Sequence, residues 1–169
     1  YPAKITESNT LSLAEPCAFY SADRNQICVI MREELGKKSS YFMVSSDGGG
    51  SWTEPSELPP ALNGIRHVAK YLPNGKLMIS FGSRYNGYYP NDWVAWIGDY
   101  DCLQSGSGDG DYLIRIKENR TSRDWGYSGL EIKGNGQIIS VNYGMWGIDE
   151  RPYILAAAFN PIEKLYRGK

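Results

Sequence analysis

Cysteine and histidine are scarce in this chain, which limits the chemistry that it can carry. Its 169 residues include three cysteines, Cys17, Cys28 and Cys102, and one histidine, His67. The spacing of the cysteines fits no metal site, and a single histidine excludes a metal centre built on several histidines. An odd number of cysteines also argues against a disulfide framework. We therefore expect neither a metal nor another cofactor.

The chain also lacks an excess of charge of either sign and any long apolar run. Its 18 basic residues are matched by 19 acidic ones, so the formal net charge is −1. Non-specific nucleic-acid binding and attachment to an anionic membrane surface both need a clear basic excess, so we expect neither. A membrane-spanning helix needs about 18 or more consecutive apolar residues, and the sequence contains no such run.

What the sequence has in abundance is aromatic residues and short apolar segments separated by turns. Aromatic residues make up 13% of the chain, and such residues favour strands. Pairs of apolar segments flank polar turns at residues 23–25, 73–75 and 134–136. An Asn-Gly turn between apolar segments is typical of a β-hairpin, and no long segment has helical periodicity. The sequence therefore predicts an all-β fold.

These hairpins recur in three units of similar design, which cover about residues 12–60, 61–119 and 120–165. Units of roughly 45 to 60 residues with four short strands each are typical of the blades of a β-propeller. A β-sandwich is the competing all-β fold, but it does not predict the same hairpin at equivalent places. Because propellers have about four to eight blades, we expect about three blades of a larger ring.

One turn carries an unusual combination of residues. The stretch SSDGGGSW, residues 45–52, joins an aspartate, three consecutive glycines and a tryptophan. Aspartate and serine side chains can hydrogen-bond nearby backbone N–H groups, glycine allows a tight bend, and the tryptophan can anchor the turn in a core. The pattern S-x-D-x-G-x-S-W resembles the Asp-box of sialidases (neuraminidases) and related propellers, where it links the two outer strands of a blade. The resemblance implies a β-propeller. In that family the Asp-box lies away from the active site, so it implies little about the chemistry.

Further segments resemble a bacterial branch of sialidase-like hydrolases. They are GIRHVAKYLPNGKLMISF from Gly64, DWVAWIGDYD from Asp92 and GYSGLEIKGNGQIISVNYGMW from Gly126. With the stretch from Glu15 to Arg32 they cover nearly the whole chain, and they correspond to the C-terminal half of such an enzyme. The resemblance implies an exo-acting glycosidase that removes a terminal acidic sugar such as sialic acid. In a bacterial host it favours a secreted or periplasmic location.

The resemblance assigns catalytic roles to Tyr127 and Glu15. Tyr127 corresponds to the family's tyrosine nucleophile, and Glu15 corresponds to the glutamate that takes the phenol proton. A sialic acid carries a carboxylate on its anomeric carbon, which would repel a carboxylate nucleophile but does not repel a neutral phenol. A phenol is a poor nucleophile near neutral pH and therefore needs a base. The family's acid/base aspartate and first arginine lie in its N-terminal half, and no segment here matches them.

Four further residues are candidate substrate ligands. Arg32 and Arg84 correspond to arginines that hold the substrate carboxylate, since a guanidinium can donate two parallel hydrogen bonds to it. Arg66 and His67 precede a strand at the rim where substrate loops often lie. For His67 a structural role, with a hydrogen bond to the protein itself, is the interpretation that we favour.

The sequence leaves other functions open. A non-catalytic propeller that binds carbohydrate or protein is one alternative, and an inactive fragment of the enzyme is another. The expected partners are a glycan with an acidic sugar and the blades that complete the ring. Those blades come from the N-terminal half of a longer polypeptide, which we favour, or from a second copy of the chain.

Overall fold

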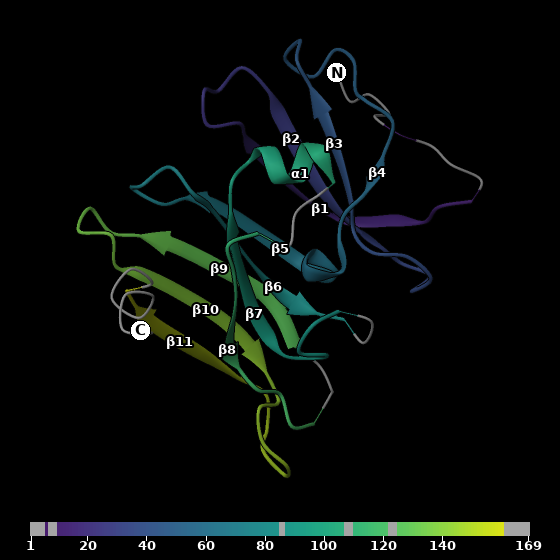
Figure 1. Ribbon diagram of the computed structural model, residues 1–169. Helices are drawn as coiled ribbons and strands as arrows, with labels where there is room; N and C mark the ends of the chain where they lie inside the picture. Colours follow the sequence, from purple (N-terminus) through teal and green to yellow (C-terminus); the bar gives the residue numbers. More distant parts are fainter. Residues whose placement is uncertain (1–5, 7–9, 85–86, 107–109, 122–124, 161–169) are drawn as a thin grey trace.

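The structure is a computed structural model that describes residues 6, 10–84, 87–106, 110–121 and 125–160. Three antiparallel sheets follow one another along the chain and lie next to each other in space (Figure 1). In the described ranges, no helix is long and apolar enough to cross a membrane.

Each sheet is a meander in which neighbours in the sequence are neighbours in the sheet. The first sheet consists of β1 (Leu13–Tyr20), β2 (Ile27–Glu33), β3 (Tyr41–Ser45) and β4 (Ser56–Glu57). The second consists of β5 (Gly64–Tyr71), β6 (Leu77–Ser83), β7 (Trp93–Gly98) and β8 (Tyr112–Lys117). The third consists of β9 (Trp125–Ile132), β10 (Ile138–Gly144) and β11 (Tyr153–Phe159). Two short helical segments are also present, the 3₁₀ turn η1 (Pro60–Leu62) and α1 (Asp101–Ser105).

The predicted all-β fold is confirmed, with one difference from the predicted four strands per unit. The third sheet has three strands among the described residues, whereas the first two have four each. The first strands of the three sheets are neighbours, because β1 packs against β5 and β5 packs against β9.

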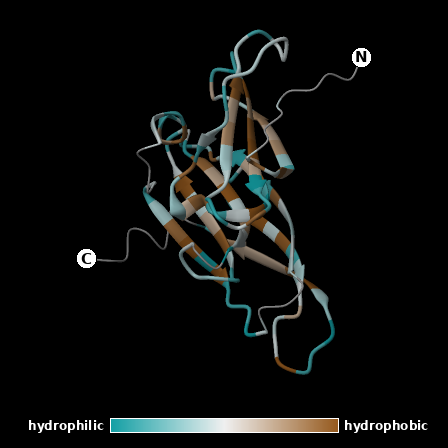
Figure 2. Ribbon diagram, turned by 90° about the vertical axis from the view of Figure 1, so that its right-hand side faces the viewer, coloured by the Kyte–Doolittle hydropathy of each residue, from teal (hydrophilic) through white to brown (hydrophobic). Residues whose placement is uncertain are grey.

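The second sheet lies in the middle and has an apolar side chain layer on both faces. Along β6, Leu77, Ile79 and Phe81 pack toward the first sheet, whereas Met78 packs toward the third. This alternation follows from the two-residue period of a strand. Sheets buried on both faces need nearly continuous apolar strands, and every residue of β6 and β7 is buried. Figure 2 shows hydrophobic residues along the strands and hydrophilic ones mostly in the loops.

The turn between the first two strands is built in the same way in all three sheets. Asp23, Asn74 and Asn135 each accept a hydrogen bond from the backbone N–H two residues later, at 3.1, 3.2 and 3.1 Å. A side chain that replaces a backbone acceptor in this way is the reason why Asp and Asn favour turns. The turns that recur in the sequence thus share the same hydrogen bond from side chain to backbone.

The SSDGGGSW stretch forms a closed turn between β3 and β4. The Asp47 carboxylate accepts hydrogen bonds from the Ser51 N–H at 2.8 Å, the Ser51 hydroxyl at 2.7 Å and the Ser45 hydroxyl at 2.8 Å. Gly49 has a φ of 97°, which strongly favours glycine, and its carbonyl accepts the Trp52 indole N–H at 3.2 Å. The expected hydrogen bonds of this turn are therefore present, and the turn joins the last two strands of its sheet.

His67 belongs to the core. Its ring stacks on Phe81 with the centroids 4.9 Å apart, and its Nε2 lies 3.0 Å from the Leu62 carbonyl oxygen. A carbonyl oxygen only accepts, so Nε2 carries the proton in this contact. Burial lowers the pKa of His67 to about 4, against the opposing effect of the bond to Leu62. The candidate substrate role predicted for His67 is thus not supported by its position, whereas the structural role is.

Asp47 should make the stability of the protein sensitive to acid. The hydrogen bonds from Ser51 and Ser45 lower its pKa in the folded protein far below the ordinary value. The stabilisation is therefore fully present above about pH 4 and is lost as the pH falls further. We expect Asp47→Asn to lower the melting temperature at pH 7, and the gap to wild type to shrink at pH 3. Thermal unfolding at both values, with Glu54→Gln as a control for charge, measures this. An equal gap at both pH values would contradict it.

His67 should make the stability of the protein depend on pH in a higher range than Asp47 does. Its folded pKa of about 4 lies below the unfolded value of about 6.5. The unfolded chain therefore binds more protons between these values, so stability is full above pH 6.5 and decreases toward pH 4. At pH 4 the loss approaches about 3 kcal/mol. Chemical denaturation should show this slope in the wild type and not in His67→Gln, which keeps an N–H donor but does not titrate. Parallel plots of the free energy of unfolding against pH for the two proteins would show that His67 is not the group responsible.

Candidate functional site

A β-bulge occurs at the same place in β1, β5 and β9, the first strands of the three sheets. Residues 15–16, 66–67 and 127–128 each lie opposite a single residue of the next strand. The first residue of each bulge is Glu15, Arg66 or Tyr127, with φ values of 51°, 54° and 58°. This left-handed conformation costs a non-glycine residue about 1–2 kcal/mol. The strain therefore falls on three residues that the sequence had singled out.

The bulges bring these three side chains together. The strands β1, β5 and β9 are neighbours, and the bulges lie at the same level along them. A bulge shifts the alternation of the strand and re-aims its side chains. Residues far apart in the sequence thus meet at one end of the three sheets.

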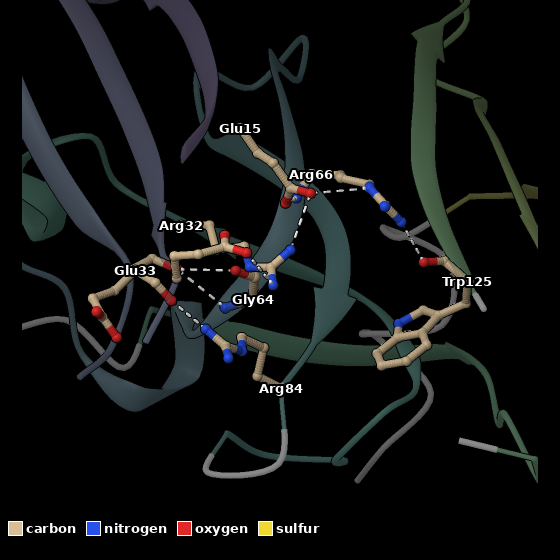
Figure 3. A network of polar contacts seen from close by, with 9 residues as sticks. Glu15, Arg32, Glu33, Gly64, Arg66, Arg84 and Trp125 are labelled. Atoms are coloured by element: carbon tan, nitrogen blue, oxygen red, sulfur yellow. Dashed lines mark hydrogen bonds and ion pairs between the residues drawn. The ribbon is translucent and has the colours of Figure 1, made fainter. Parts of the chain in front are cut away.

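Glu15 is the centre of this cluster. Its Oε1 lies 3.1 Å from Nη1 of Arg32 and 3.2 Å from Nε of Arg66, and its Oε2 accepts the backbone N–H of Arg66 at 3.2 Å (Figure 3). The three side chains are 24%, 21% and 23% exposed, for Glu15, Arg32 and Arg66 respectively. One carboxylate thereby joins β1, β2 and β5 through charge-assisted contacts.

Arg66 extends the cluster to the third sheet. Its Nη1 donates a hydrogen bond to the Trp125 carbonyl oxygen at 2.7 Å, and its guanidinium carbon lies 4.0 Å from the centre of the Tyr127 ring. Tyr127 itself is 69% exposed. Among the described residues, no hydrogen bond joins the Tyr127 hydroxyl to Glu15. The direct contact expected between these two groups is thus not found, and Arg66 contacts both instead.

Arg84 lies at the edge of the cluster. It follows β6, and its Nη1 donates to the carbonyl oxygen of Glu33, the residue after Arg32 (Figure 3). Arg32 also pairs with Glu34, with 3.2 Å between Nη2 and Oε1. Three guanidinium groups thus lie near an exposed phenol, together with the carboxylates of Glu15, Glu33 and Glu34.

The structure thus brings together five of the six candidate residues and leaves one apart. Glu15, Arg32, Arg66 and Tyr127 are linked by direct contacts, and Arg84 reaches the backbone next to Arg32. His67 lies in the core on the other side of its bulge.

Two residues of this region escaped the sequence analysis. Trp125 supplies the carbonyl that holds Arg66, and Gly126 lies where a side chain would collide with the Arg66 guanidinium. The available signal was the position of Gly126 directly before the candidate Tyr127. Guanidinium groups beside an exposed phenol can bind an anionic group and place it next to a nucleophile or a hydrogen-bond donor.

Solved structures with a similar arrangement of strands include proteins that act on glycans. A protein of unknown function from Dyadobacter fermentans DSM 18053 has a TM-score of 0.73 and 16% identity over 91% of this chain and 40% of that one. A xylan β-1,4-xylosidase from Bacillus halodurans C-125 has a TM-score of 0.61 and 13% identity over 92% and 30%. An ulvan lyase of polysaccharide lyase family PL25 has a TM-score of 0.56 and 16% identity over 88% and 38%.

No protein-family model matches the sequence. No curated protein matches it either. The chain spans 40% or less of the length of these three solved structures. At such low identity the likeness concerns the fold alone, which is all-β, resembles a β-propeller and is shared with enzymes that act on carbohydrates.

Proposed function

We propose that this chain forms part of an exo-acting glycoside hydrolase of the sialidase type, which cleaves a terminal acidic sugar such as sialic acid. The observation that carries the proposal is the meeting of Glu15, Arg32, Arg66 and Tyr127 at one end of three neighbouring sheets. Residues up to 112 positions apart, from 15 to 127, contribute to one cluster. The closed SSDGGGSW turn and the likeness in fold to glycan-active enzymes add support.

In this proposal the arginines bind the acidic group of the sugar. Arg32 and Arg84 come from the first and second sheets, so they can approach one carboxylate from two sides. A guanidinium offers two parallel N–H groups to a carboxylate, which a lysine cannot do. Such hydrogen bonds favour an anionic sugar over a neutral one.

Tyr127 is the proposed nucleophile. Its oxygen forms a bond to the anomeric carbon while the bond to the leaving group breaks, and the phenol proton passes to the Glu15 carboxylate. Water then attacks the same carbon, Tyr127 leaves and recovers its proton from Glu15, and the proton of the water passes to a base outside the cluster. The leaving group takes its proton from an acid outside the cluster, since none of the five residues is placed for that role. Because no described hydrogen bond joins the Tyr127 hydroxyl to Glu15, the phenol proton reaches the carboxylate through one water molecule in this proposal, while Arg66 keeps its contacts with both residues.

Hydrolysis of a fluorogenic 4-methylumbelliferyl sialoside tests this function. The umbelliferyl group leaves readily without protonation, so the assay depends little on an acid from elsewhere. We expect turnover by the wild type and a loss of kcat of about 10²-fold or more in Tyr127→Phe. Arg32→Lys should raise KM by about tenfold, because one of two charge-assisted hydrogen bonds is lost.

Tyr112→Phe is the matched control, since Tyr112 is an exposed tyrosine of β8. Equal activities of Tyr127→Phe and Tyr112→Phe would contradict the role of Tyr127. Binding of the sialoside without turnover would identify a carbohydrate-binding module instead. Neither binding nor turnover would refute the proposed substrate.

We also propose that further blades complete a ring around these three sheets, supplied by a longer polypeptide. The outer strand β11 exposes Tyr153 at 41% and Ile154 at 75%, and an exposed apolar edge strand promotes association. The segments that resemble sialidases match only the C-terminal half of that pattern, which favours a longer polypeptide over a second copy. Light scattering on the isolated chain should therefore show a monomer or aggregates. A stable, monodisperse dimer would contradict this preference.

A further inference from the structure

Arg66 occupies an unusual position, because one side chain contacts all three sheets. It belongs to β5 of the second sheet, pairs with Glu15 of the first, and reaches Trp125 and Tyr127 of the third. The Arg66 backbone N–H also donates to Glu15, so both the backbone and the side chain hold the same carboxylate. Contacts of this kind fix the position of Arg66 in the free protein.

The backbone of the third sheet leaves room for this arginine at Gly126. A Cβ atom at Gly126 would lie 2.4 Å from Nη1 and 2.7 Å from Cδ of Arg66. Gly126 also has a φ of 135°, which side chains rarely adopt. A side chain at position 126, directly before the candidate nucleophile, would therefore collide with Arg66 of the second sheet.

The chemistry of the contact with Tyr127 is that of a cation on an aromatic face. At 4.0 Å from the ring centre, the guanidinium is well within the range of about 6 Å for a cation–π interaction. Such a contact fixes the plane of an otherwise exposed ring. A substrate that needs the Tyr127 oxygen aimed at one carbon gains from that restriction, because misplacement by about 1 Å can lower the rate by about 10²-fold.

We propose that Arg66 is a positioning residue, which holds the Tyr127 ring and the Glu15 carboxylate in a fixed relation, and that Gly126 is required for its passage. The sequence had placed Arg66 among the substrate ligands. The contacts of its Nε, its Nη1 and the face of its guanidinium are instead directed at the protein. The catalytic part of this inference rests on the proposed function. The bridge, by which we mean the contacts of Arg66 with Glu15, Trp125 and Tyr127, does not.

A double-mutant cycle tests the bridge without any substrate. Gly126→Ala should lower the melting temperature in the wild type, both by backbone strain and by collision with Arg66. In an Arg66→Ala background the strain remains but the collision is gone, so the drop should be smaller by about 2 °C or more. Gly75 has a φ of 84° and open space around it, so Gly75→Ala should cause the same drop in both backgrounds. Equal drops for Gly126→Ala in both backgrounds would overturn the bridge.

Nuclear magnetic resonance provides a second test that is independent of stability. The guanidinium signal of Arg66, identified by its absence in Arg66→Lys, should lie upfield because it is shielded by the face of Tyr127. Tyr127→Leu should return it to an ordinary position, and Tyr112→Phe should leave it unchanged. An Arg66 signal that does not respond to Tyr127→Leu would show that the two side chains are not in contact in solution.

Kinetics on the fluorogenic sialoside separate positioning from substrate binding. We expect Arg66→Ala to lower kcat by about 10- to 100-fold with KM within about twofold of the wild type. A rise in KM at unchanged kcat would identify Arg66 as a substrate ligand and overturn the positioning role. If the wild type cleaves no sialoside, the proposed function fails, and the cycle and the resonance still decide whether Arg66 forms the bridge.

Discussion

The Glu15 carboxylate is the contact on which the arrangement of the site depends. It accepts hydrogen bonds from the Arg32 side chain of the same sheet and from the Arg66 backbone N–H of the next one, and it forms an ion pair with the Arg66 side chain. Hydrogen bonds to charged groups contribute about 1.5–3 kcal/mol each, less where water reaches them. The left-handed backbone at Glu15 and Arg66 costs about 1–2 kcal/mol per residue. The contacts of Glu15 are therefore sufficient to offset the strain of the two bulges that they join.

The third bulge is maintained differently. Tyr127 is largely exposed, and its ring rests on Arg66. A cation–π contact contributes about 0.5–2 kcal/mol, which is comparable with the strain at Tyr127. The hydrogen bond from Arg66 to Trp125 adds to it. Of Glu15, Arg32 and Arg66, only Arg66 has a described contact with the third sheet. A change at Glu15 should therefore affect Tyr127 through Arg66.

The sequence predicted the features that depend on local signals. The hairpins at Asn74 and Asn135 and the turn around Asp47 follow from side chains that bond to their own neighbourhood, and they form as predicted. The resemblance to sialidases brought together Glu15, Arg32 and Tyr127, and the structure places them in one cluster. The bulges escaped prediction because none of their first residues is a glycine, and the reach of Arg66 depends on Gly126, 60 positions later. The inward direction of His67 follows from the bulge in β5, which no local sequence pattern predicts.

One carboxylate, that of Glu15, couples the first strands of the three sheets at the site. Hydrogen exchange of the backbone amides in Glu15→Ala tests this coupling most directly, because the Arg66 amide is itself a donor to Glu15. We expect faster exchange in the variant at the bulge of β5 and, through the released Arg66 side chain, near Tyr127 in β9. Amides of β11 should exchange as in the wild type. Faster exchange confined to β1, with β5 and β9 unchanged, would contradict this coupling.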